Sequence, residues 1–244
     1  MKTDDKKNLY SRYMTTHFGK IHGDNQEFPI HNRYFRKNFL KLLPADRNVK
    51  IVDLGCGMGH FLNFLEKENY YNYIGVDVSE ENVEFCKKNK FNAVLGNIFD
   101  FLKETNETYD VIVMNDIIEH FEKPEIIYLL QLIFDALHHN GRLIIKAPNA
   151  ANPILASSSR YYDFTHELIF TEESMSQVLR ISGFSQVFIY PQDLYVFYYN
   201  PVNYLAKLFS FLLNGILRIF FRFYGRKTTK IFTKNLIAVA IKDG

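Results

Sequence analysis

A glycine-rich segment follows an apolar run near residue 50. Asp53 lies in that run, and Gly55, Gly57 and Gly59 alternate with other residues directly after it. Glycines permit a tight turn and let a ligand approach the backbone, and the start of a following helix presents N–H groups to it. Asp77 ends the next apolar run about twenty residues later, where a carboxylate can accept both hydroxyls of a ribose. Together these residues predict a nucleoside ligand.

Two further polar segments contain residues suited to moving a proton. Asn115 and His120 come directly after an apolar run, and a later loop contains Asp163 and His166. Enzymes with parallel α/β sheets place their ligands at the carboxyl ends of strands, so the two segments are expected to converge. Histidine titrates near neutral pH. We take His166 as the first candidate general base, Asp163 as its orienting carboxylate or a substrate ligand, and His120 as the second candidate base. A structural alternative is that either histidine only caps a turn.

The same residues allow a second interpretation, a divalent metal site. Asp116, Glu119 and His120 follow an i, i+3, i+4 spacing that can face one side of a helical turn. With His166 they form a mixed nitrogen and oxygen ligand set that suits several metals. The sequence leaves the metal-bound and metal-free interpretations open.

Strand-like and helical patterns alternate along most of the chain, which predicts a parallel sheet covered on both faces. The expected strands are Lys50–Leu54, Tyr73–Val78, Ala93–Leu95, Asp110–Asn115, Arg142–Ala147, Gln186–Tyr190 and Leu236–Ile241. The expected helices are His60–Lys67, one capped by Ser79, Pro124–His138 ended by Asn140-Gly141, and Thr171–Ile181 ended by Gly183. We therefore predict an α/β, Rossmann-like, seven-stranded and mostly parallel sheet.

This pattern fits a single domain over residues 1–244. We expect an N-terminal lid or cap over 1–48, a core over 49–190, a helical insertion over 191–235 and a final strand over 236–242. The lid contains helical spacing from about His31 to Leu43, and a helix that merely covers one sheet face is an equal alternative. Cys56 and Cys86 are the only cysteines, and no apolar stretch follows the charged first residues, so we expect a protein of the reduced cytosol.

The glycine segment identifies the ligand more closely. Dinucleotide enzymes use Gly-x-Gly-x-x-Gly, whereas this chain has Gly-x-Gly-x-Gly with Asp53 two residues before it, which favours S-adenosylmethionine. Over Val49–Tyr190, with a last strand near Leu236, the chain resembles the class I S-adenosylmethionine-dependent methyltransferases. The resemblance implies S-adenosylhomocysteine as product and the following contacts: Asp53, Gly55 and Gly57 with the methionine end, Asp77 with the ribose, Val78 with one adenine face, Asn97 and Ile98 with the adenine edge, and Asn115 beside the sulfonium. The family commonly has Asp where this chain has Asn97.

The segment Tyr162–Glu167, followed by Phe170-Thr171 and Gly183-Phe184, resembles methyltransferases of bacterial surface-polysaccharide (capsule) biosynthesis. This implies O-methylation of a sugar or of a sugar substituent such as a phosphoramidate, with a small-molecule or glycan acceptor. Near His120 the chain is also similar to ubiquinone-pathway and small-RNA methyltransferases, which have Glu in place of Asp116. The alternatives are therefore a quinone or other small-molecule O-methyltransferase, with or without a metal, and a non-catalytic protein that binds S-adenosylmethionine and acts as a partner.

The insertion differs from the rest of the chain in charge. The segment Leu194–Lys242 has eight Lys or Arg residues and no acidic residue, which leaves the remainder at net −6 in a chain of net +2. Its residues 201–226 form a basic amphipathic pattern, which suits an anionic membrane surface, a homodimer contact or packing on its own domain. The uncharged run between Lys207 and Arg218 is half of the ~20 residues that a membrane span needs, so we do not expect a span. We expect no nucleic-acid partner, because no recognition motif accompanies the charge. A membrane-attached form would lie at the inner face of the membrane.

Overall fold

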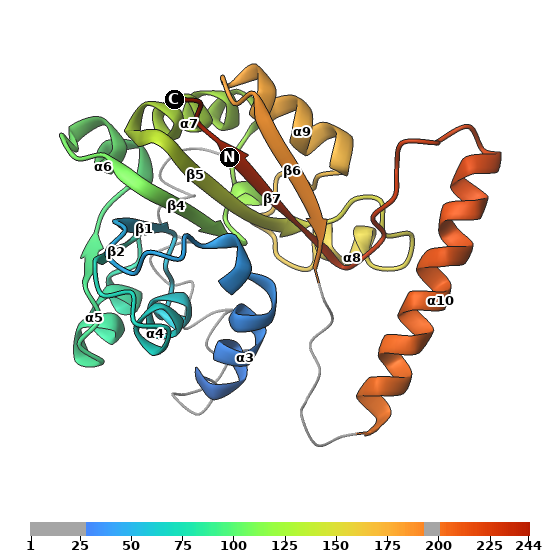
Figure 1. Cartoon of the computed structure of the whole chain (residues 1–244), viewed down its shortest axis with the longest axis horizontal. Helices are drawn as coiled ribbons and strands as arrows, with labels where there is room; N and C mark the ends of the chain where they lie inside the picture. Colours follow the sequence, from blue (N-terminus) through green and yellow to red (C-terminus); the bar gives the residue numbers. More distant parts are fainter. Residues whose placement is uncertain (1–27, 193–200) are drawn as a thin grey trace.

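The computed structural model describes residues 28–192 and 201–244. Its centre is one seven-stranded sheet, ordered β3-β2-β1-β4-β5-β7-β6, in which only β7 runs antiparallel to its neighbours (Figure 1). The strands are β1 (Ile51–Leu54), β2 (Tyr73–Asp77), β3 (Ala93–Leu95), β4 (Tyr109–Asn115), β5 (Leu137–Pro148), β6 (Gln186–Pro191) and β7 (Asn235–Ile241). The predicted Rossmann-like sheet is confirmed.

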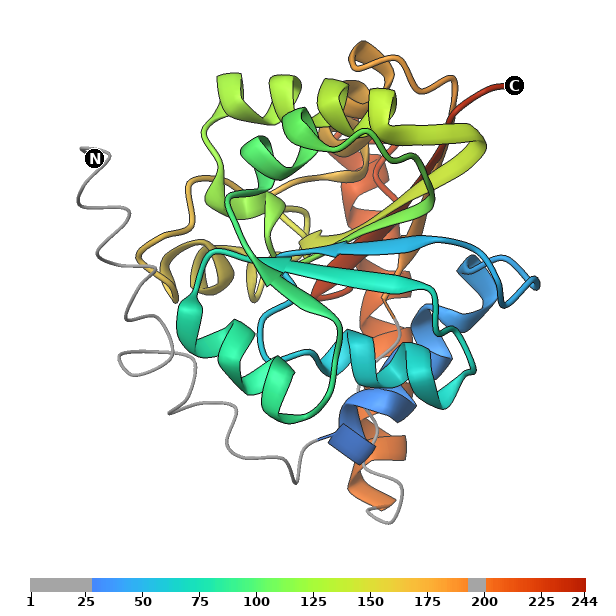
Figure 2. The same ribbon diagram turned by 90° about the vertical axis from the view of Figure 1, so that its left-hand side faces the viewer.

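Helices cover both faces of this sheet (Figure 2). Their bounds are α3 (Phe28–Asn38), α4 (His60–Lys67), α5 (Glu80–Lys88), α6 (Ile98–Glu104), α7 (Lys123–Ala136), α8 (Ala156–Tyr161), α9 (Glu172–Ile181) and α10 (Pro201–Phe223), with short 3-10 turns η3 (Leu40–Leu42) and η4 (Ile118–His120). Alternating strand residues divide the core: Val52 and Leu54 pack with α6, α7 and α9, whereas Ile51 packs with α3, α4 and α5. The apolar strands are buried on both faces, as parallel sheets require.

Local signals account for several helix starts. Ser79 is the N-cap of α5, and its side chain accepts a hydrogen bond from the Asn82 N–H. Thr171 starts α9 with a capping box that includes Ser174. Each cap satisfies N–H groups that the first turn of a helix leaves unpaired. These starts agree with the helices expected from the sequence.

The expected end of α7 is wrong. The sequence suggested a helix through His138 that Asn140-Gly141 would end, but α7 ends at Ala136, and Leu137 already begins β5. The β4–β5 register shifts between Tyr109 and Val111, and the Asn140 N–H donates to the Lys242 carbonyl. Asn140 therefore sits in an irregular start of β5 and pairs with the far end of the chain, a partner that local spacing does not reveal.

Helix α3 and the residues directly after it pack against the core of the domain. Within α3 and the residues after it, Phe35 and Phe39 are buried against Phe61 and Phe64 of α4. This favours the alternative in which the helix covers one sheet face, although Tyr34 also reaches the site described below. The part of the expected lid before residue 28 lies outside the described residues.

The expected helical insertion forms α10, which stands away from the sheet in Figure 1. It has 23 residues, and none of them is buried. Among the described residues, α10 is the one helix that is long and apolar enough to cross a membrane by length and composition. The expectation of no span rested on the uncharged run between Lys207 and Arg218, and the helix extends beyond that run at both ends.

Candidate active site

The glycine turn lies at the carboxyl edge of the sheet. Leu54 pairs with Val76 on one side and Met114 on the other, so the residues that follow these three strands begin at the same edge. Gly55 and Gly57 have positive φ angles of 79° and 51°. A Cβ on Gly55 would meet Ile117 at 2.9 Å, whereas a Cβ on Gly57 would have no heavy atom within 4 Å. The turn therefore leaves room beside Gly57, where a ligand can approach the backbone.

Asp77 holds this turn in place. One carboxylate oxygen accepts the Gly57 N–H at 2.8 Å, and the other accepts the Ser79 N–H at 2.9 Å and the Asn82 amide at 3.1 Å. Burial raises the pKa of Asp77, while these three donors oppose the rise. A carboxylate oxygen has a second lone pair, so the expected contact with a ribose remains compatible with this arrangement.

Asp53 and Asn115 contribute buried polar atoms to the same edge. Among the described residues, Asp53 Oδ1 and both amide atoms of Asn115 have no hydrogen-bond partner. Burial, with a smaller effect of Asp77, raises the pKa of Asp53 to about 8, and Lys146 opposes the rise. Buried polar atoms without partners are costly in a folded protein, so their grouping here suits a polar ligand. A cationic group of that ligand would stabilise ionised Asp53.

The residues expected at the adenine follow the neighbouring strands β2 and β3. Val78 is 47% exposed and Ile98 is buried. Asn97 is exposed, but its side-chain oxygen accepts the Phe99 N–H at 2.8 Å as the N-cap of α6. The oxygen expected to accept from the adenine amino group therefore already has one donor, and an adenine contact would use its second lone pair.

The two polar segments after β4 and β5 converge as expected. The rings of His120 and His166 lie 4.7 Å apart between centroids. The Glu167 N–H donates to the Glu119 carbonyl at 2.7 Å, which fixes the later loop on η4. Arg160 also donates to the His166 carbonyl. The structure thus brings His120, Asp163 and His166 together.

Hydrogen bonds determine the tautomers of both histidines. The Thr165 hydroxyl donates its single proton to Asp163 at 2.6 Å, so at 2.7 Å it accepts from Nδ1 of His120. Nδ1 of His166 donates to the Ser159 carbonyl at 2.7 Å. In the neutral form both rings therefore have the lone pair on Nε2. Burial, then the neighbouring His166, lowers the pKa of His120 to about 4, which keeps His120 neutral at pH 7. Asp163 therefore orients His120, through the Thr165 hydroxyl. The sequence had led us to expect that Asp163 would orient His166.

Three of the four proposed metal ligands also meet here. Glu119, His120 and His166 each offer one ligand atom, and these atoms lie within 4.8 Å of one another. Glu119 Oε2 is buried without a hydrogen-bond partner among the described residues, and burial raises the pKa of this carboxyl. The residues fit a divalent metal, because a cation would supply the missing partner of that oxygen.

Asp116 is not part of this cluster, and that prediction is wrong. Its φ of 52° and the short 3-10 turn that follows remove the α-helical spacing. Its carboxylate forms an ion pair with Lys146 instead.

Sequence reasoning missed a buried group beside the cofactor residues. Lys146 of β5 is buried, and its ammonium lies 5.3 Å from the ring of Tyr34 on α3. The Tyr34 hydroxyl accepts from Gln192 at 3.0 Å, and burial raises its pKa to about 12. Burial opposes the charge of Lys146, but the Asp116 carboxylate holds the pKa of Lys146 above its usual value, so the ammonium stays charged. The lysine within the apolar run Leu143–Pro148 could have been recognised in the sequence. Its contact with Tyr34, 112 positions earlier, could not.

Comparisons with known proteins identify the class. A family described as a methyltransferase domain matches residues 28–187. The chain belongs to this family of S-adenosylmethionine-dependent methyltransferases. The cofactor of the family is S-adenosylmethionine, as expected from the glycine turn.

Individual relatives are more distant. The human mitochondrial ubiquinone biosynthesis O-methyltransferase is 26% identical over 66% of this chain and 44% of its own length. Phosphoethanolamine N-methyltransferase 3 of Arabidopsis thaliana is 27% identical over 62% of this chain and 32% of its own length. A crystal structure of a SAM-dependent methyltransferase from Archaeoglobus fulgidus has a TM-score of 0.68, 22% identity and coverage of 94% of this chain and 100% of the other. The chain spans less than half of the two curated relatives, whose names include both oxygen and nitrogen acceptors.

Proposed function

We propose that this chain transfers a methyl group from S-adenosylmethionine to a hydroxyl oxygen. The observation that carries the proposal is the histidine pair His120 and His166 at the edge that holds Asn115, in which the hydrogen bond of His166 Nδ1 leaves the lone pair of the neutral His166 ring on Nε2. The acceptor oxygen attacks the methyl carbon, the carbon–sulfur bond breaks and its electron pair stays on sulfur. The hydroxyl proton passes to Nε2 of His166. The products are S-adenosylhomocysteine and a methyl ether.

The acceptor we favour is a sugar of a glycan precursor, as in surface-polysaccharide biosynthesis. Next to the histidines, the loop exposes three aromatic side chains, Tyr161, Tyr162 and Phe164, at 78%, 63% and 85%. Aromatic faces with a polar edge suit ligands that are apolar on one side and hydroxylated on the other, as a sugar ring is. The resemblance of Tyr162–Glu167 to polysaccharide methyltransferases supports the same class, including a phosphoramidate-type substituent.

The direct test measures S-adenosylhomocysteine formation with a panel of nucleotide sugars and phenolic acceptors. We expect turnover with at least one sugar acceptor and a loss of about 10²–10⁴-fold in kcat for His166→Ala. Binding of S-adenosylhomocysteine to His166→Ala, measured by calorimetry, should stay unchanged. Full turnover by this variant would eliminate His166 as the base. Tight cofactor binding without turnover on any acceptor would favour the non-catalytic partner protein.

A second candidate is a metal-dependent O-methyltransferase of a quinone or related phenol. The Glu119, His120 and His166 cluster favours it, together with the name of the human relative. These three residues would hold the metal, which would act as a Lewis acid on the acceptor oxygen. Calorimetric titration of the protein with Mg²⁺, Mn²⁺ and Zn²⁺, with Glu119→Gln as the comparison, separates the two candidates. Metal binding that Glu119→Gln abolishes, and turnover lost in EDTA, would favour this candidate over the metal-free one.

A further inference from the structure

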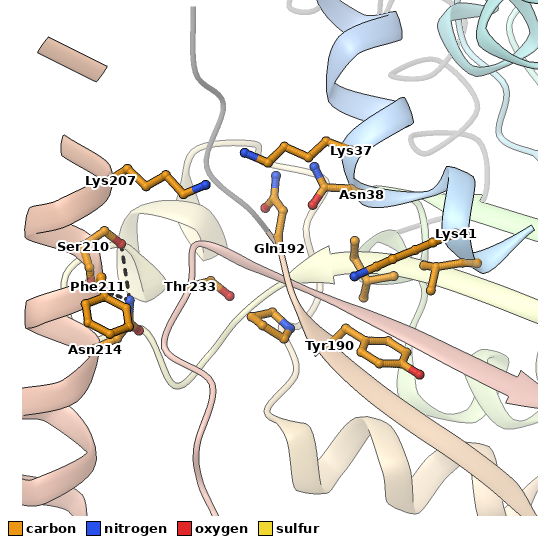
Figure 3. A pocket seen from close by; sticks show the side chains of 13 residues that line it. Lys37, Asn38, Lys41, Tyr190, Gln192, Lys207, Ser210, Phe211, Asn214 and Thr233 are labelled. Carbon is orange, nitrogen blue, oxygen red and sulfur yellow. Dashed lines mark hydrogen bonds between the residues drawn. The ribbon is translucent and has the colours of Figure 1, made fainter. Parts of the chain in front are cut away.

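The α10 helix leaves a broad apolar face toward solvent. The α10 residues that are only partly exposed lie on one side of the helix, and they are Asn203, Ser210, Leu213, Asn214, Leu217 and Phe221. Ser210 and Asn214 line a cavity of about 330 Å³ between α10, α3 and β6, where Lys207 points toward Lys37 (Figure 3). Helices of globular proteins normally turn their apolar side inward, whereas α10 has only Leu213, Leu217 and Phe221 there and leaves its other apolar side chains exposed.

The outward apolar face consists of six residues spaced by three or four positions. Their exposed fractions range from 51% to 84%, and they are Leu205, Leu208, Leu212, Ile216, Ile219 and Phe223. No residue of α10 is buried, so packing on its own domain does not cover this face. A continuous apolar face of this length on a surface normally marks an interaction site.

The charges around this face are all positive. By helical geometry Lys207, Arg218 and Arg222 lie along one flank, between the inward side and the outward apolar face. Arg226 and Lys227 follow the helix, and no acidic residue occurs from Leu194 to Lys242. Long basic side chains at such a boundary can place their charges among lipid headgroups while their stems stay in apolar surroundings. The charge pattern is complementary to an anionic membrane.

Connectivity argues against a transmembrane orientation, although the helix has sufficient length and hydropathy. The Arg218 side chain donates to the Lys230 carbonyl at 2.8 Å, and the Phe221 and Phe232 rings lie 4.6 Å apart. These contacts hold the end of α10 against the domain. The start of α10 follows the same domain after a short linker. A span would force non-helical chain back through the hydrocarbon layer, where its backbone polar groups would be unsatisfied.

We propose that α10 docks this protein on an anionic membrane by lying in the plane of the interface. The outward apolar face enters the boundary between headgroups and acyl chains, and the basic flank contacts anionic headgroups. The catalytic edge stays in water on the protein side of the helix. This inference is independent of the proposed acceptor, because it concerns a surface and a readout that do not involve methyl transfer.

The first experiment is sedimentation with vesicles of phosphatidylcholine alone or mixed with phosphatidylglycerol. We expect the wild-type chain to bind the mixed vesicles at least tenfold more tightly, with binding weakened by salt. Leu212→Asp should reduce binding more than tenfold, as should Arg222→Glu with Arg226→Glu. The matched control is Ile181→Asp on α9, which replaces a side chain of similar exposure, 61% against 54%, and should bind as the wild type does.

The orientation is tested by fluorescence, because the chain has no tryptophan. Three single replacements, Leu205→Trp, Leu212→Trp and Phe223→Trp, place a reporter at the start, middle and end of the outward face. Quenching by brominated lipids should give the same shallow depth for all three. A deep middle position with shallow ends would overturn the in-plane orientation and indicate a span.

Two other results would overturn the proposal. One is equal sedimentation of the wild-type chain and Leu212→Asp with both vesicle types. The other is no vesicle binding together with a dimer in light scattering that Leu212→Asp dissociates, which would make a second copy the occupant of the face. Circular dichroism and thermal melting of each variant confirm that a loss of binding does not reflect unfolding.

Discussion

The space beside Gly57 permits a test of the cofactor site that separates binding from folding. Both Gly57 and Gly59 have positive φ angles, 51° and 75°, so an alanine at either position is strained by about 1–2 kcal/mol. The reduced freedom of the unfolded chain returns about 0.4–1 kcal/mol. For Gly57→Ala nothing lies within 4 Å of the new methyl group, so the free energy of unfolding should fall by only about 1 kcal/mol.

The Gly59→Ala variant is the matched control. Its methyl group would meet the Phe91 ring at 2.8 Å and Cys86 Sγ at 3.0 Å. Overpacking of this kind costs about 1–3 kcal/mol, which brings the expected loss to about 2–4 kcal/mol. The two variants thus share the backbone strain and differ in what the methyl group contacts: open space at Gly57, the protein core at Gly59.

The assay is calorimetric titration with S-adenosylhomocysteine, together with urea unfolding. Gly57→Ala should weaken binding at least tenfold, because a ligand that approaches the turn meets the methyl group. Gly59→Ala should lose more stability and, under conditions where it is folded, retain affinity within a factor of about three. Wild-type affinity in Gly57→Ala would show that the ligand does not approach this part of the turn, and would refute the placement of the cofactor.

Three further predictions concern single side chains. The raised pKa of Asp53, about 8 against about 4 unfolded, means that its contribution to stability falls as pH rises from about 4 to 8. A cationic cofactor should therefore release up to one proton at pH 7, measured as a buffer-dependent heat that Asp53→Asn removes. Asp77→Ala removes the acceptor of three hydrogen bonds and should lower both cofactor affinity, at least tenfold, and stability, by about 1–3 kcal/mol; unchanged values of both would contradict its role. Thr171→Ala should cost about 1 kcal/mol in urea unfolding through the lost cap of α9, and a change in cofactor affinity would be unexpected.

The features that were predictable from sequence depend on short-range physics. Strands of the core are apolar runs, and the caps at Ser79 and Thr171 act on N–H groups within three residues, so both can be located without knowing the fold. The glycine turn and Asp77 are also predictable, because adjacent parallel strands bring their carboxyl ends to one edge. The convergence of His120 with His166 followed from the same rule.

The errors arose where distant partners decide the structure. Asn140-Gly141 is a typical helix end, yet Asn140 pairs with Lys242 at the far end of the chain. Asp116 has the spacing of a metal ligand, yet it forms an ion pair with Lys146. In each case a local preference is overridden by one long-range contact, and residue spacing contains no information about that contact.

The α10 helix shows that a sequence can predict an amphipathic helix without predicting which of its sides faces the protein. Spacing defines an apolar side and a polar side, but the side that faces the protein depends on contacts with distant parts of the chain. Here Arg218 bonds to Lys230 and Phe221 contacts Phe232, which fixes the rotation of the helix end and leaves most of the apolar side chains outward. Exposed apolar area of this extent is unfavourable in water, so a structure that holds it outward is stable only if other interactions offset the cost or another surface covers it. The exposed apolar area, rather than the helical pattern, is therefore the reason to test α10 for membrane binding.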